Sequence, residues 1–83
     1  MMLDDFIKEQ ANQGIRIRFF YEKDFTDKMI FKVRFSNQYD FHMQIEIPNE
    51  LLTSEEKLVE YLKFLVEEFH RKEKEKGYGY ELP

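Results

Sequence analysis

Residues 15–47 read IRIRFFYEKDFTDKMIFKVRFSNQYDFHMQIEI, and apolar and polar side chains alternate along three parts of this segment. Alternation with a period of two residues is typical of β-strands that bury one face and expose the other. Polar connections separate the three parts, as expected for consecutive hairpins. The segment therefore predicts a three-stranded antiparallel meander with strands at about 15–22, 28–36 and 39–47.

The sequence on each side of this segment has the apolar spacing of an amphipathic helix. Over residues 3–13 the spacing predicts a short helix, and Gly14 suits the left-handed turn that ends it. Over residues 54–76 it predicts a long helix, in which Thr53 and Glu56 have the spacing of a capping box. The apolar stripe of this second helix consists of Leu58, Tyr61, Leu62, Leu65 and Phe69, flanked by Val59 and Val66.

The chain after Phe69 loses its apolar residues. The charged run 71–76 is expected to continue the helix into solvent beyond the core. Residues 77–83 are expected to form a tail that carries Tyr78 and Tyr80.

These elements predict one α+β domain over residues 1–83, with the order α-β-β-β-α. We expect two layers, in which the three-stranded antiparallel meander is packed on one face by the N-terminal helix and the long C-terminal helix.

We predict the register of the sheet from the side chains that would face each other across the strands. A three-residue loop between the second and third strands would place Arg34 opposite Asp40 and Val33 opposite Phe41, and we prefer it to a five-residue loop. In the first hairpin we expect Arg18 to face Lys32, as it would if Tyr21 lay opposite Met29. That register also places Arg16 opposite Arg34 and Phe20 opposite Ile30.

The composition restricts the class of protein. Apolar residues make up 42% of the chain and aromatic residues 17%, which is enough for a packed core and too much for a disordered chain. There is no Cys, and no apolar run reaches the roughly 18 residues of a membrane span. We expect a cytoplasmic protein, and the net charge of −4 makes a general nucleic-acid binder less favoured.

Catalytic chemistry is not expected. His42 and His70 have no nucleophile or metal-ligand pattern beside them, and the three glycines form no phosphate-binding loop. The sequence therefore predicts a protein that is not an enzyme, with no cofactor and no metal site.

One candidate binding surface is the outer face of the sheet. Arg16 and Arg18 of the first strand point the same way as Lys32 and Arg34 of the second, and Phe20 adds an aromatic ring. Bases and an aromatic side chain on an exposed sheet are typical of surfaces that hold single-stranded nucleic acid. The alternative is a face whose charges are neutralised by neighbouring acids.

The second candidate surface is the outer side of the long helix. Glu56, Glu60, Phe64 and Glu67 fall on one stripe that faces away from the core. An aromatic residue at the centre of a surface patch is a favoured anchor for a protein partner. The alternatives are a solvated helix with one tolerated Phe, or a homodimer that buries Phe64 or Phe20.

The plan of helix, three-stranded sheet and helix resembles small accessory proteins of phages and mobile elements, among them some anti-CRISPR inhibitors. The resemblance rests on the helix at 3–11, the meander at 15–47 and the helix at 53–76. It implies a non-enzymatic inhibitor that occupies the basic nucleic-acid groove of a host protein. The leading hypothesis is therefore a protein-binding module that uses its acidic and aromatic helix face, and the alternatives are a weak nucleic-acid binder and a homodimer.

Overall fold

The elements follow one another in the predicted order. The structure, a computed structural model, describes residues 2–77, so the expected roles of Tyr78 and Tyr80 lie outside the described residues. The elements are α1 (Leu3–Asn12), β1 (Arg16–Lys23), β2 (Met29–Ser36), β3 (His42–Glu46), the 3-10 helix η1 (Asn49–Thr53) and α2 (Glu55–Lys76). This arrangement confirms the predicted α+β fold.

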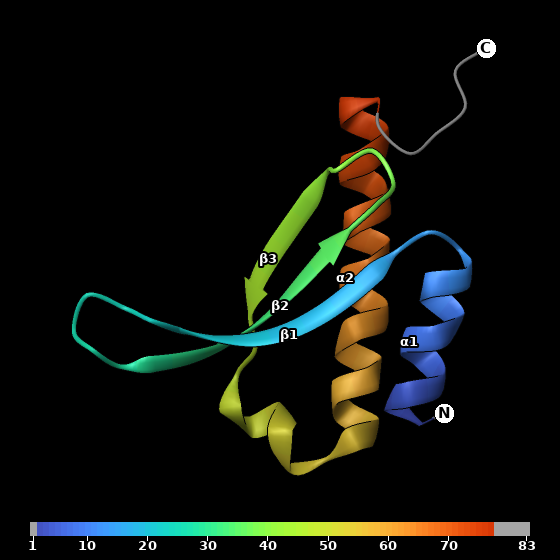
Figure 1. Cartoon of the computed structure of the whole chain (residues 1–83). Coiled ribbons are helices and arrows are strands. Elements are labelled where there is room, and N and C mark those ends of the chain that lie inside the picture. The colour runs from blue at the N-terminus through green and yellow to red at the C-terminus, as the bar shows by residue number, and fades with distance from the viewer. Residues whose placement is uncertain (1, 78–83) are drawn as a thin grey trace.

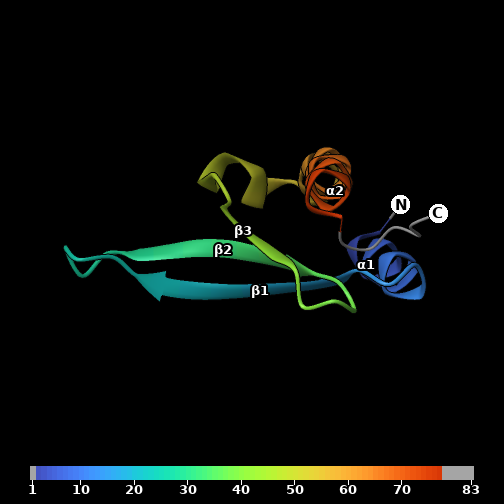
Figure 2. The same ribbon diagram turned by 90° about the horizontal axis from the view of Figure 1, so that it is seen from above.

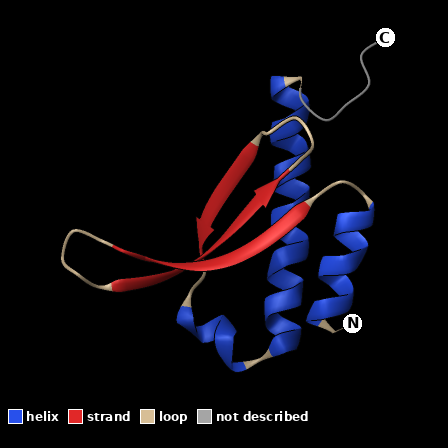
Figure 3. Cartoon of the chain, viewed as in Figure 1, coloured by secondary structure: helices blue, strands red, loops and turns tan. Residues whose placement is uncertain are grey.

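α2 and η1 form a layer over one face of the sheet, whereas α1 lies at about the level of the sheet, beyond the beginning of β1 (Figures 1 and 2). The sheet is antiparallel with the strand order β1-β2-β3, and α2 crosses one face of it. α1 lies beside α2, next to the beginning of β1, and η1 leads from β3 back to α2 (Figure 3). The opposite face of the sheet carries no helix in the described part of the chain.

A tight turn connects α1 directly to β1. Gly14 has a φ of +90°, which glycine adopts readily because it has no Cβ. Its N–H donates to the carbonyl of Ala11 while the N–H of Ile15 donates to that of Gln10, the two bonds of a Schellman motif. Ile15 is then buried, so the end of the helix and the start of the sheet share one core residue.

The register of the first hairpin differs from the predicted one by two residues. Tyr21 lies opposite Phe31 rather than Met29, so Arg18 faces Arg34 and Phe20 faces Lys32. The ladder extends to the pair of Lys23 and Met29. The turn between the two strands therefore has five residues, the first of which is Asp24.

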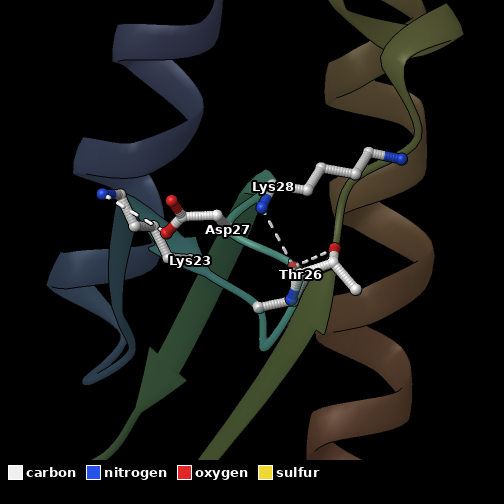
Figure 4. Close-up of polar contacts among 5 residues, drawn as sticks. Lys23, Thr26, Asp27 and Lys28 are labelled. Atoms are coloured by element: carbon white, nitrogen blue, oxygen red, sulfur yellow. Dashed lines mark hydrogen bonds and ion pairs between the residues drawn. The ribbon is translucent and has the colours of Figure 1, made fainter.

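The carboxylate of Asp24 holds this turn together. Its Oδ1 accepts hydrogen bonds from Thr26 Oγ1 at 2.6 Å, from Thr26 N at 2.8 Å and from Lys28 N at 3.0 Å. These hydrogen bonds hold the pKa of Asp24 below its usual value because they stabilise the ionised form. The bond from the Thr26 hydroxyl has the largest effect. Lys23 and Asp27 add an exposed ion pair across the turn (Figure 4).

The register between β2 and β3 is also not the predicted one. β3 begins at His42 rather than near residue 39, and Arg34 faces Gln44 instead of Asp40. The reason is the side chain of Asn37, whose Oδ1 accepts the N–H groups of Tyr39 and Phe41 and so stabilises a longer connection. The buried face is kept, because Phe35 and Met43 now lie opposite each other and both are buried.

The core lies between α2 and the inner face of the sheet. The predicted stripe of α2 is buried, except that Tyr61 is half-buried. The helix begins one residue later than the capping-box pattern suggests: Ser54 is the N-cap, and its hydroxyl accepts the N–H of Lys57. Glu55 Oε2 accepts the N–H of Leu3 at 2.6 Å, which ties the starts of the two helices together.

The distal part of the β1–β2 hairpin projects from this core as an arm (Figures 1 and 2). The radius of gyration is 13.7 Å. A compact chain of this length would have about 12 Å. Phe25, at the tip of the arm, is fully exposed.

Two positions on α2 test this packing directly. Leu62 is completely buried and Phe64, two residues later, is 55% exposed. We expect Leu62→Ala to lower the free energy of unfolding by about 2–5 kcal/mol, because it leaves a cavity in the core. Phe64→Ala should change it by less than about 0.5 kcal/mol, as is usual at the surface. Urea denaturation of both variants measures the difference, and similar losses would contradict the orientation of α2.

Candidate functional site

The predicted helix face is present on α2. Glu56, Glu60, Phe64 and Glu67 are all exposed, at spacings of four, four and three residues that keep them on one side of the helix. The core stripe occupies the opposite side, so packing of α2 on the sheet turns this face to solvent.

The acids of this face border the junction between α1 and α2. Glu56 and Glu60 line a hollow of about 470 Å³ together with Met2 and Lys63. Glu67 and Lys63 line a second hollow of about 300 Å³, beside Phe6 and Gln10 of α1. Lys63 therefore lies between the acids and interrupts the negative strip that the sequence suggests.

Three of the charged residues beyond Phe64 are paired with one another. Arg71 donates to Glu68 at 2.5 Å and to Glu75 at 2.8 Å. The hydrogen bond and charge of Glu68, followed by the charge of Glu75, raise the pKa of Arg71. The face therefore presents an exposed ring among mixed charges.

The outer face of the sheet carries the second predicted group, in a different arrangement. Arg16 and Arg18 are exposed on β1, and Arg34 is half-buried on β2. Arg18 and Arg34 lie directly opposite each other, which is unfavourable for like charges. Among residues 2–77, none of these three guanidinium groups has an acidic partner in ion-pair contact.

Lys32 differs from these arginines because it is neutralised within the sheet. Its Nζ lies 2.6 Å from Oε1 of Glu22. Phe20, opposite Lys32, is only half-buried, so the aromatic ring predicted for this face is accessible. The structure thus brings the four predicted basic residues together on one face. Three of them, the arginines, have no acidic partner among residues 2–77.

A third polar cluster is one that the sequence analysis missed. Glu73 lies in the run predicted to be solvated, yet it is only 3% exposed. Its Oε2 accepts a hydrogen bond from Asn37 Nδ2 at 2.6 Å, and its Oε1 lies 2.9 Å from Nδ1 of His70. The cluster joins α2 to the β2–β3 connection. The sequence could have indicated this burial, because Glu73 continues the buried stripe of α2 four residues after Phe69.

This cluster borders a hollow on the described part of the chain. The hollow measures about 610 Å³. Carboxamides at the end of α1 (Asn12 and Gln13) and after β2 (Asn37 and Gln38) line it together with Glu73. Within residues 2–77, no three His, Asp or Glu side chains come close enough to hold a metal ion. None of the helices described is both long and apolar enough to cross a membrane.

Comparison with protein families, with curated proteins and with solved structures gives no match for this chain.

Asn37 provides a test of the buried cluster. Asn37→Ala removes the donor to Glu73 and the acceptor for the N–H groups of Tyr39 and Phe41. We expect the free energy of unfolding to fall by about 1–3 kcal/mol, the cost of leaving buried polar groups unpaired. Gln38→Ala, at the neighbouring exposed position, is the control. Equal denaturation curves for the two variants would show that the cluster contributes nothing to stability.

Proposed function

We propose that the protein is a small, non-enzymatic protein-binding module that covers part of a partner's surface with the outer face of α2. The observation that supports this most directly is the exposure of Phe64. Every other large apolar side chain of α2 is buried or half-buried. An aromatic residue in the middle of a polar surface is the type of side chain that dominates binding energy at interfaces.

The position of Phe64 on a fixed element favours binding. Ser54 caps the start of α2, the Leu3–Glu55 hydrogen bond fixes its first turn, and Glu73 fixes its last turns to Asn37. A residue held on such a helix loses little conformational freedom when it binds. Phe64 can therefore act as a preorganised anchor.

The acids around Phe64 indicate the class of partner. Glu56, Glu60 and Glu67 favour a positively charged protein surface, such as the nucleic-acid groove of a host protein. Occupying that groove would make the protein a phage-type inhibitor that acts in the cytoplasm. Because Lys63 interrupts the acids, the affinity is expected to depend more on Phe64 than on net charge.

A pull-down from nuclease-treated bacterial lysate tests this proposal. Wild-type protein should retain a stoichiometric protein partner, and Phe64→Ala should lose it. The loss of an interface anchor corresponds to an affinity about 30-fold weaker. Leu52→Ala is the matched control, because Leu52 is a similarly exposed apolar residue on η1.

The two variants separate the outcomes. Retention of the partner by Leu52→Ala together with its loss in Phe64→Ala would support the α2 face. Retention by both variants, or recovery of no protein partner by the wild type, would overturn the proposal.

A second candidate function is supported by the open sheet face. Arg18 faces Arg34, and neither has an acidic partner in residues 2–77, so an anionic ligand would relieve their repulsion. Phe20 lies beside them and offers a ring on which a base can stack. This arrangement favours a weak single-stranded nucleic-acid binder.

Fluorescence anisotropy with a labelled single-stranded RNA over a series of salt concentrations tests this candidate. We expect affinity to fall as salt rises, because phosphate contacts release counterions. The double variant Arg16→Glu/Arg34→Glu should abolish binding, whereas Lys57→Glu/Lys63→Glu, which changes the net charge equally on α2, should not. Equal losses in both double variants would mean that only net charge matters and would exclude a site on the sheet.

A further inference from the structure

β1 is an edge strand whose outer backbone groups have no partner among the described residues. The sheet order is β1-β2-β3, and the N–H of Asp24 donates to the carbonyl of Lys28, so Asp24 bonds toward β2. Bonding direction alternates along an antiparallel strand. Residues 17, 19, 21 and 23 therefore direct their N–H and C=O groups toward the free edge. An edge of this kind is a template for pairing with another strand.

The same part of β1 exposes aromatic surface. Tyr21 is 62% exposed, although its ring packs 4.9 Å from that of Phe31, and Met29 is also exposed. Phe19 stacks on Phe31 at 5.6 Å and is half-buried. The inner face of the arm thus keeps apolar side chains exposed at Tyr21 and Met29, which is unusual for a strand that meets only water.

We propose that β1 pairs antiparallel with β1 of a second copy of this chain, about a two-fold axis at Phe20. The charges of β1 select this partner. On the outer face of β1 the order is Arg16, Arg18, Phe20 and Glu22, and Asp24 follows at the start of the turn. This order is self-complementary, because reversing it places Arg18 opposite Glu22 of the second copy and Arg16 opposite its Asp24. A two-fold interface requires such self-complementarity.

Neighbouring registers are less favourable. A shift of two residues toward the start of β1 pairs Arg16 with Glu22 and leaves Arg18 opposite Phe20. A shift of two toward its end pairs Arg18 with Asp24 and leaves Glu22 opposite Phe20. Larger shifts place Arg18 opposite Arg18 or Glu22 opposite Glu22, and like charges directly opposite are destabilising. Only the axis at Phe20 pairs both arginines with acids.

The inner face fits the same register. Phe19 lies opposite Tyr21 of the second copy, so each exposed tyrosine gains an aromatic neighbour across the strands. Residues 17, 19, 21 and 23 meet one another as hydrogen-bonded pairs, which uses the free backbone groups of both edges. The second copy's hairpin turn reaches the beginning of β1 at Arg16, beside a hollow of about 370 Å³ lined by Ala11, Gly14 and Arg16.

The pairing is independent of the α2 face, which lies on the other layer and is not used. It also predicts the mass of the species that forms in solution. Sedimentation velocity over a series of concentrations should show a species of twice the 10.3 kDa of one chain.

Two charge variants test the register through their mixture. Arg18→Glu alone would oppose Glu22 of its copy, and Glu22→Arg alone would oppose Arg18, so each should sediment as a monomer. Mixed in equal amounts, the two should form a heterodimer, because each altered residue then meets an opposite charge. Both positions are exposed, and circular dichroism checks that both variants are folded.

A cysteine placed on the axis tests the geometry. The chain has no Cys, and Phe20 would face its own copy as a non-hydrogen-bonded pair. Cα atoms in such pairs are about 4.5 Å apart. A disulfide spans about 4.4–6.8 Å. Phe20→Cys should therefore form an intermolecular disulfide under mild oxidation, whereas Gln44→Cys, exposed on β3, should remain largely reduced.

Several results would overturn the pairing. They are a wild-type monomer at every concentration, a dimer that persists in both single charge variants, and a mixture that stays monomeric. A dimer that Phe64→Glu dissociates while Arg18→Glu leaves it intact would also overturn it, since that dimer would use α2. Equal cross-linking of the two cysteine variants would exclude the axis at Phe20.

Discussion

The packing of Phe69 against Phe35 is the contact on which the rest of the structure depends. Both side chains are fully buried, with ring centroids 6.0 Å apart, and the ring of Phe41 lies 5.4 Å from the ring of Phe69. Burial of Phe69 sets the rotation of α2, and Phe64 lies about 140° around the helix from it. Burial of Phe35 likewise fixes which face of β2 is inward, so Arg34 points outward. One aromatic contact thus orients both candidate surfaces.

The fold could be predicted from the sequence because its elements follow from side-chain periodicity. Alternation over residues 15–47 indicates strands, and the apolar spacing of the two flanking segments indicates helices. Neither indication depends on the conformation of the loops. Register could not be predicted in the same way. Any shift of two residues keeps every side chain on its face, so the alternation does not distinguish the possible registers.

The register is instead decided by two side chains in the connections. The carboxylate of Asp24 folds the first turn, and the carboxamide of Asn37 stabilises a five-residue connection where cross-strand charge pairing favoured a shorter one. Such capping of backbone groups is a matter of local geometry, which cross-strand pairing does not capture.

The candidate surfaces were predictable to the extent that they depend on one element. Phe64 is placed outside by helical spacing alone, and the basic residues are placed outside by alternation. Glu73 was missed because its partner, Asn37, is distant in sequence and on another element. A buried carboxylate inside a charged run is recognisable only when the group that compensates it is known.

The short length of β3 has a consequence for how far the sheet can grow. β3 spans only His42–Glu46, and Pro48 follows it without an N–H to donate. This edge offers few backbone groups to an incoming strand, whereas β1 offers a longer row. The two edges of the sheet are therefore unequal as templates. A sheet that adds strands readily at one edge only gives closed pairs of molecules and not filaments, which need complementary contacts at both ends.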